Sequence, residues 1–120
     1  MKYHISESEY RFMEILWESE PVNSMELVHL CQEKLGWKKS TTYTVIRKLS
    51  DKGIVCNKET VVRTLVSRDS MQKQESNEFL DKKFGGSLPS FVTAFLQDRK
   101  LTREEAEYLK KLIQEKTEED

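Results

Sequence analysis

The sequence contains few of the residues that build turn-rich or covalently cross-linked folds. Its 120 residues include 4 Gly, 2 Pro and 2 Cys. So few Gly and Pro argue against a β-sandwich or barrel, because those folds need many tight turns. The two cysteines, Cys31 and Cys56, form neither a disulfide framework nor a zinc ribbon. The low cysteine content is typical of a protein from a reducing, cytoplasmic compartment.

The chain also lacks the motifs of large cofactor-binding enzymes. Neither GxGxxG nor GxxxxGKS/T occurs, and no Ser-His-Asp, Cys-His or paired-carboxylate arrangement stands out. The sequence contains no run of 18 apolar residues, so no membrane-spanning helix is predicted. The segment Met1–His4 is not followed by the apolar core of a signal sequence. We therefore expect a cytoplasmic protein that is not an enzyme and that holds no metal or cofactor.

The charge is nearly balanced overall but unevenly distributed. The formal net charge is -1, yet one segment is basic and the C-terminal end is acidic. Between residues 34 and 52 a single acid, Asp51, stands against Lys34, Lys38, Lys39, Arg47, Lys48 and Lys52. A local basic stripe on a nearly neutral protein is a weak indication of nucleic-acid binding. An ordinary solvated helix face is the alternative.

Three short amphipathic helices are predicted in the N-terminal half. The first begins with a capping box, in which Ser6 and Glu9 satisfy each other's backbone N–H groups. Gly36 supplies a left-handed stop after the second helix. The expected ranges are Ser6 to about Glu20, Asn23 to Gly36, and Ser40 to Asp51. A tight, Gly-containing turn between the second and third helices predicts a helix-turn-helix, although a helical hairpin without a DNA role remains the alternative.

The period of the sequence changes after Gly53. Residues 54–56 and 61–66 are short and rich in β-branched side chains, with Asn57–Thr60 between them. This pattern predicts a two-stranded hairpin, even though the turn contains no Gly. Helices followed by such a hairpin make a winged helix-turn-helix, which we expect to occupy residues 1–67.

Residues 68–120 are predicted to be helical again, giving a mainly α protein. Helices are expected through Phe84, over Leu88–Leu96, and after a capping box of Thr102 and Glu105. Three helices in about 50 residues bury little of their own apolar surface. A homodimer covers that surface, whereas helices folded back on the N-terminal domain are the alternative. The predicted dimerisation residues are Phe91, Val92, Phe95, Leu96, Leu109, Leu112 and Ile113.

The third helix has the layout of a DNA recognition helix. At 100° per residue, Thr42, Val45, Ile46 and Leu49 fall on one side and polar residues on the other. An outward Arg pairs bidentately with guanine, small hydroxyl residues meet base edges or thymine methyl groups, and flanking Lys residues suit phosphates. An ordinary polar surface is the alternative. The predicted DNA-binding residues of this region are Lys38, Lys39, Ser40, Thr41, Tyr43, Thr44, Arg47 and Lys48.

Four stretches carry a resemblance to a known family. They are Ile5–Trp17, Trp37–Gly53, Leu65–Arg68 and Phe84–Ser87, of which the second matches W-x-x-S/T-T-x-x-T-x-x-x-[KR]-L-x-x-K-G. The chain resembles the penicillinase-repressor family, the BlaI/MecI/CopY-type bacterial transcriptional repressors, over nearly its whole length. The resemblance implies a winged helix-turn-helix that binds palindromic double-stranded DNA operators as a homodimer. It implies DNA contacts from Ser40, Thr41, Tyr43, Thr44 and Arg47, and phosphate contacts from Lys58 and Arg63 in the wing.

The resemblance also bears on how such a repressor is switched off. In one branch of the family, a membrane sensor-protease system triggers cleavage within the dimerisation helices, before a Phe. The matching bond here joins Ala94 and Phe95, although cleaved relatives have Asn at the first position. The copper-responsive branch uses a C-terminal CxC…CxC set, and this chain has no cysteine after Cys56. The alternative function is a protein-interaction module that docks on a partner regulator without reading DNA.

Overall fold

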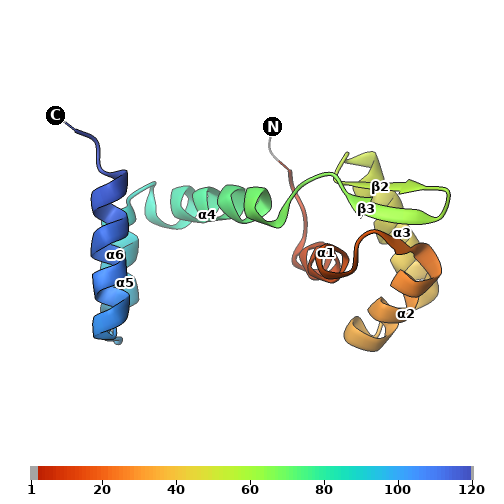
Figure 1. The fold of residues 1–120 in the computed structure, drawn as a ribbon, viewed down its shortest axis with the longest axis horizontal. Helices are drawn as coiled ribbons and strands as arrows, with labels where there is room; N and C mark the ends of the chain where they lie inside the picture. The colour runs from red at the N-terminus through yellow and green to blue at the C-terminus, as the bar shows by residue number, and fades with distance from the viewer. Residues whose placement is uncertain (1–2, 120) are drawn as a thin grey trace. The chain divides into compact units, whose positions relative to one another are not determined.

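The computed structural model describes residues 3–119. Its chain divides into two compact units, one ending at Ser76 and the other beginning at Asn77. Within the described residues the elements follow each other in a mainly helical order (Figure 1). They are α1 (Glu7–Ser19), β1 (Val22–Asn23), α2 (Ser24–Leu35), α3 (Lys39–Asp51), β2 (Val55–Lys58), β3 (Val61–Thr64), α4 (Arg68–Phe84), α5 (Leu88–Leu96) and α6 (Arg103–Lys116).

Local capping interactions account for where the helices begin. The Ser6 hydroxyl accepts a hydrogen bond from the Glu9 N–H at 3.2 Å, and the Glu9 carboxylate accepts one from the Ser6 N–H at 2.8 Å. Thr102 and Glu105 make the same reciprocal pair at the start of α6. Both predicted capping boxes are thus confirmed. Each satisfies two backbone donors that the first helical turn leaves without a partner.

The predicted hairpin is present, although β2 continues through Asn57 and Lys58, which the sequence placed between the strands. The hairpin belongs to a three-stranded antiparallel sheet of order β1-β3-β2. The hairpin turn consists of Glu59 and Thr60, which have φ values of 52° and 65°. Such left-handed conformations are uncommon for residues other than glycine. Here the start of α2 supports the turn, because the Thr60 carbonyl accepts a hydrogen bond from the Ser24 N–H at 2.8 Å. The wing tip is therefore held close to the helix-turn-helix.

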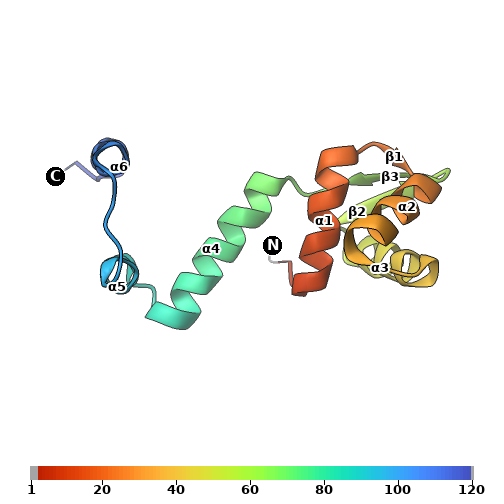
Figure 2. The same cartoon turned by 90° about the horizontal axis from the view of Figure 1, so that it is seen from below.

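The core of the first unit is a single apolar cluster of buried side chains. Figure 2 shows the three N-terminal helices and the sheet that surround it. Each element contributes side chains that are fully or almost fully buried. Burial of this area supplies most of the favourable free energy of folding. The largest fully buried apolar side chains are Phe12, Met13, Leu16, Leu27, Leu49, Ile54, Met71, Val55 and Val62.

Helix α4 links the two compact units. It begins at Arg68, where Ser67 caps it by accepting a hydrogen bond from the Ser70 N–H at 3.1 Å. The domain boundary between residues 67 and 68 stays a prediction. The two compact units divide within α4, between Ser76 and Asn77. The first turns of α4 belong to the first unit, since Met71 is fully buried in its core.

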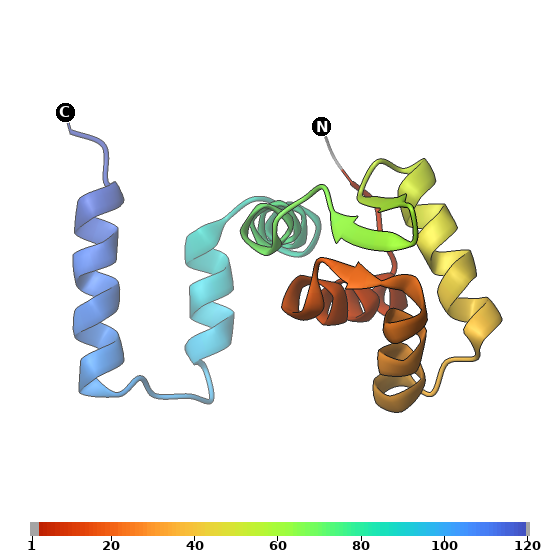
Figure 3. The same cartoon turned by 45° about the vertical axis from the view of Figure 1, so that its right-hand side comes forward.

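The second unit consists of the end of α4 together with α5 and α6. Figure 3 shows α5 and α6 running in opposite directions. Four aromatic rings, those of Phe79, Phe84, Phe91 and Phe95, follow one another with centroids 5.4 to 5.9 Å apart. No described residue of α5 or α6 is nevertheless fully buried. No helix within residues 3–119 is both long and apolar enough to span a membrane.

The α1 capping box makes folding stability depend on pH. Burial by itself raises the pKa of Glu9, but the hydrogen bond from the Ser6 N–H and the charge of Lys52 outweigh it and hold that pKa below its ordinary value. A lowered pKa stabilises the fold above the unfolded-state value of about 4.3, and this stabilisation disappears as the pH falls through the folded-state pKa.

Glu9→Gln is therefore expected to lower the free energy of unfolding by about 1 kcal/mol at pH 7. The difference from the wild type should shrink below about pH 4, because the wild-type carboxylate is then protonated as well. Urea unfolding at pH 7 and pH 3 measures both values. Glu14→Gln is the matched control, because Glu14 is exposed on the same helix. A difference that stays equal at the two pH values contradicts this account.

Candidate nucleic-acid interface

Helix α3 separates a buried side from a polar side. Ile46 and Leu49 are buried against the core, as the helical period predicts, and Thr42 is buried with them. Arg47 and Lys48 are exposed on the other side. The two residues at the start of that side, Ser40 and Thr41, are exposed as well. The first turn of α3 thus presents small hydroxyl groups, and the third presents two cations.

The beginning of α3 offers an anion-binding end. Lys38 is the N-cap residue, and within residues 3–119 no side chain caps the helix there. No described residue of the first turn is acidic, while Lys38 and Lys39 are both exposed. The N–H groups of a first helical turn point outward and carry the positive end of the helix dipole. This end of α3 therefore suits a phosphate group.

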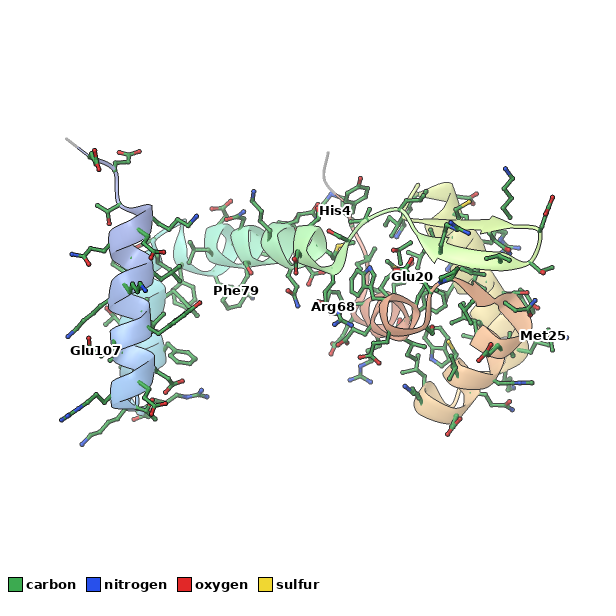
Figure 4. All side chains as sticks on the ribbon, in the orientation of Figure 1. His4, Glu20, Met25, Arg68, Phe79 and Glu107 are labelled. Atoms are coloured by element: carbon green, nitrogen blue, oxygen red, sulfur yellow. The ribbon has the colours of Figure 1, made fainter. Side chains whose placement is uncertain are left out.

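The side chain of Tyr43 is less exposed than the helical wheel predicts. Its side chain is half-buried, and its hydroxyl lies 3.5 Å from Ser24 Oγ and 3.4 Å from the sulfur of Met25. Met25, labelled in Figure 4, belongs to α2. The ammonium group of Lys39 lies 5.9 Å from the centre of the Tyr43 ring. Tyr43 thus links α3 to α2, and part of its ring and hydroxyl remains accessible.

Thr44 is also half-buried and uses its hydroxyl within the helix. The Thr44 hydroxyl donates a hydrogen bond to the carbonyl of Ser40 at 2.9 Å. Hydroxyl groups of Ser and Thr make this contact to the preceding turn when they lie inside a helix. The hydroxyl of Thr44 is thus engaged within its own helix, and its methyl is the group of this residue that suits a thymine methyl.

Lys52 belongs to the basic stripe of the sequence but not to this face. Its ammonium group donates a hydrogen bond to the carbonyl of His4 at 2.7 Å and lies 3.4 Å from Glu9 Oε1. Figure 4 labels His4 on the N-terminal segment, which precedes α1. Lys52 follows Lys48 by four residues in the sequence, but in the fold the ammonium group of Lys52 is directed toward the start of α1. The outward cations near α3 are therefore Lys38, Lys39, Arg47 and Lys48.

The wing carries both of its predicted cations on its outer face. Cys56 pairs with Arg63, and Lys58 pairs with Val61, so these side chains share one side of the sheet. Val55 and Val62, on the opposite side, are buried in the core. With Glu59, the outward side chains line a shallow cavity of about 430 Å³. Lys58 and Arg63 are exposed there, which leaves both charges available to a ligand.

The predicted dimerisation residues all lie in the second unit, on α5 and α6. Phe91 and Leu96 are half-buried, and the other five are exposed: Val92, Phe95, Leu109, Leu112 and Ile113. Phe79 was missed by the sequence analysis. Its ring meets that of Phe91 edge-on at 5.9 Å, yet 48% of Phe79 remains exposed. The sequence feature that could have identified Phe79 is its position as a large apolar residue after the polar stretch that forms the middle of α4.

No described cluster of three or more His, Cys, Asp or Glu residues is suited to a metal ion. Ala94 and Phe95 are exposed in the last turn of α5.

The first unit has the architecture of a winged helix-turn-helix protein. It combines three helices with a small sheet whose hairpin forms the wing, and α3, the second helix of the helix-turn-helix, presents its polar side outward. The chain belongs to the penicillinase repressor family, whose sequence model matches residues 5–115. The resemblance seen in the sequence is thereby confirmed.

Individual relatives support the same assignment. The chain is 27% identical over 118 residues to the methicillin resistance regulatory protein MecI of Staphylococcus aureus strain Mu50, which covers 95% of this chain and 96% of that protein. It is 26% identical over 116 residues to the penicillinase repressor of Bacillus licheniformis, covering 92% and 90% of the two chains. A penicillinase repressor of Staphylococcus aureus is 26% identical over 113 residues, covering 91% and 90%.

The two cysteines are expected to react very differently with a thiol reagent. Cys31 is fully buried in α2, and burial raises the pKa of its thiol. Cys56 is half-buried on the outer face of the wing. Because the thiolate is the reactive form, Cys56 should react with Ellman's reagent at pH 8 while Cys31 reacts only after unfolding in urea. The variants Cys56→Ser and Cys31→Ala assign each phase, and rapid labelling of Cys31 in the folded protein contradicts the buried placement.

Proposed function

We propose that this protein represses transcription by binding a palindromic DNA operator as a homodimer, with α3 of each subunit in a major groove. The single observation that carries this proposal is the two-sided character of α3. Burial of Ile46 and Leu49 holds the helix on the domain, while Ser40, Thr41 and Arg47 remain exposed on the other side. Recognition helices of helix-turn-helix proteins read base edges with such outward residues near their N-terminal end.

Each side chain of this face has a role that follows from its chemistry. Arg47 has the geometry for two hydrogen bonds to a guanine, and the Thr44 methyl suits a thymine. Ser40 and Thr41 lie beside the N–H groups at the start of α3, where a phosphate is favoured. Exposed cations supply the sequence-independent part of the affinity, and we assign that role to Lys38, Lys39 and Lys48.

The wing extends the same interface to the backbone of the DNA. Lys58 and Arg63 share its outward face, and both are exposed. The wing is short because its turn consists of only two residues, Glu59 and Thr60. The hydrogen bond from the Ser24 N–H to the Thr60 carbonyl holds this turn against the start of α2. We assign Lys58 and Arg63 to phosphate contacts rather than to base recognition, since neither lies on the recognition helix.

The homodimer follows from apolar surface that a single chain leaves exposed. Phe95 is 44% exposed and Leu109 is 39% exposed, although both are large apolar residues on amphipathic helices. A second copy covers such faces through a two-fold interface. Dimerisation also brings two recognition helices to two half-sites, which makes the second contact effectively intramolecular and raises the affinity.

Derepression by proteolysis stays a prediction of the family resemblance. The bond concerned, between Ala94 and Phe95, lies in the last turn of the nine-residue helix α5. Helices this short depend on tertiary contacts for their stability, and their ends open at low cost in free energy. Cleavage there by a membrane sensor-protease system separates α6 from the DNA-binding unit and thereby weakens the dimer.

Base contacts and phosphate contacts respond differently to substitution. Arg47→Ala is expected to cost about 1–3 kcal/mol on the operator and to relax the preference at one base pair. Lys38→Ala should weaken operator and random DNA equally and should lower the salt-dependence slope by about 1. Lys38 is a cleaner phosphate probe than Lys39, because Lys39 also lies over Tyr43.

Titration of the full chain with fluorescent duplexes measures both effects. The operator is first selected from a random duplex library with the wild-type protein, and a scrambled duplex of equal length serves as the non-specific probe. Lys34→Ala is the matched control, because Lys34 is exposed on α2. If Arg47→Ala and Lys38→Ala both bind the two duplexes as the wild type does, α3 is not the reading element.

The dimer is tested by placing charge in its apolar surface. Phe95→Glu and Leu109→Glu are each expected to shift the protein to monomers in sedimentation at micromolar concentration, because a carboxylate is costly to bury without a partner. Binding to the full operator should be lost with the dimer. Gln114→Glu adds the same charge to exposed polar surface of α6 and should change neither property. A wild-type protein that sediments as a monomer at this concentration refutes the proposed dimer.

A further inference from the structure

The first turns of α4 are attached to the winged domain by a set of specific contacts within residues 3–76. The carbonyl of Val66 accepts a hydrogen bond from the Trp17 indole N–H at 2.9 Å, just before the helix begins. The Arg68 guanidinium lies 5.5 Å from the centre of the Trp17 ring and 3.7 Å from Glu18 Oε1. Arg68 is labelled in Figure 4. These contacts all hold the first turn of the helix to α1.

A second attachment follows one to two turns further along α4. Met71 is fully buried in the core of the winged domain. Gln74, three residues later, makes two hydrogen bonds with the backbone of Tyr3. Gln74 Oε1 accepts from the Tyr3 N–H at 2.9 Å, and Gln74 Nε2 donates to the Tyr3 carbonyl at 2.5 Å. Residues three apart lie on neighbouring positions of one helix face, so Met71 and Gln74 meet the domain side by side.

The paired hydrogen bonds fix an orientation and not only a distance. One amide side chain satisfies both polar groups of one backbone residue, as two paired strands do. The two partners are 71 positions apart in sequence and are part-buried. We call this pair of hydrogen bonds the Tyr3–Gln74 clamp. The contacts at Val66 and Arg68 hold the beginning of α4, and the clamp holds it further along, so the helix axis has a defined direction relative to the winged domain.

That direction matters for a repressor that reads two half-sites at once. Helix α4 runs on from the winged domain into the second unit, which carries the exposed apolar residues. Each added base pair moves one half-site by about 3.4 Å and turns it by about 34° relative to the other. A helix that leaves the domain in one direction tolerates few such changes, whereas a loosely attached helix tolerates more.

We propose that Gln74 is a positioning residue, and that the Tyr3–Gln74 clamp sets which half-site spacing the dimer accepts. The inference rests on the proposed function of this protein as a dimeric operator-binding repressor. Gln74 touches no DNA in this account. It acts by defining the direction in which α4 leaves the domain that does.

The test compares Gln74→Met with Gln72→Met. Both substitutions replace a Gln of α4 by a residue of similar length, but Gln72 is exposed. The full chain is titrated with the selected operator, with the same half-sites moved apart or together by one and two base pairs, and with a single half-site. Spacing preference is the ratio of affinity for the native spacing to affinity for each altered spacing.

Gln74→Met is expected to lower that ratio by about two- to tenfold, the range for loss of one or two hydrogen bonds. Affinity for the single half-site and the dimer fraction in sedimentation should remain those of the wild type, which a general loss of structure would not allow. Gln72→Met should keep the wild-type ratio. Gln74→Glu keeps the acceptor for the Tyr3 N–H and loses the donor, so an intermediate ratio is expected and provides a second reading if the Met variant unfolds.

The outcomes separate this inference from the proposed function. If the wild type binds the operator and prefers one spacing, but Gln74→Met and Gln74→Glu keep the ratio of Gln72→Met, the clamp has no role in spacing. If the wild type binds the operator and accepts all spacings equally, the inference falls and the proposed function stands. If the wild type binds no selected duplex, both fall together.

Discussion

The burial of one side of α3 determines what the protein presents on the other. Ile46 and Leu49 occupy the core, so Arg47 and Lys48, the residues between them in sequence, are directed to solvent. A rotation of the helix by one residue, about 100°, would bring a charged side chain into the core. Burying an unpaired charge costs far more than the apolar contacts of one residue return. Apolar packing therefore defines which side of α3 is directed outward, without any contact to a ligand.

Features that depend on neighbours along the chain could be predicted from the sequence. Both capping boxes involve residues three apart, and the left-handed Gly36 that ends α2 depends only on its own backbone. The buried side of α3 follows from the helical period in the same way. These interactions are local, so residue type and spacing contain nearly all of the information that they need.

Features that depend on distant partners could not be predicted in this way. Strand β1 has two residues, too few to show a period, and it exists because Val22 and Asn23 pair with β3. Lys52 leaves the basic stripe because the carbonyl of His4 and the carboxylate of Glu9 attract its ammonium group. The polar side of α3 was predicted residue by residue, but how far Tyr43 folds toward α2 depends on Ser24 and Met25, which its own helix does not determine.

The two units rely on forces that respond oppositely to ionic strength. The outward cations of α3 and the wing attract phosphates by charge, and added salt weakens that attraction steeply. In the proposed dimer, the exposed Phe and Leu residues of the second unit associate by removing apolar surface from water. Salt screens this association little, and sulfate or phosphate ions strengthen it. For the proposed dimeric repressor, a rise in salt is therefore expected to release the protein from DNA while leaving the dimer together. In this proposal the free species is still a dimer, so its two winged domains stay linked between binding events. On the same proposal, the contacts that define the direction of α4 act before the operator is met, as preorganisation rather than as an adjustment made on the DNA.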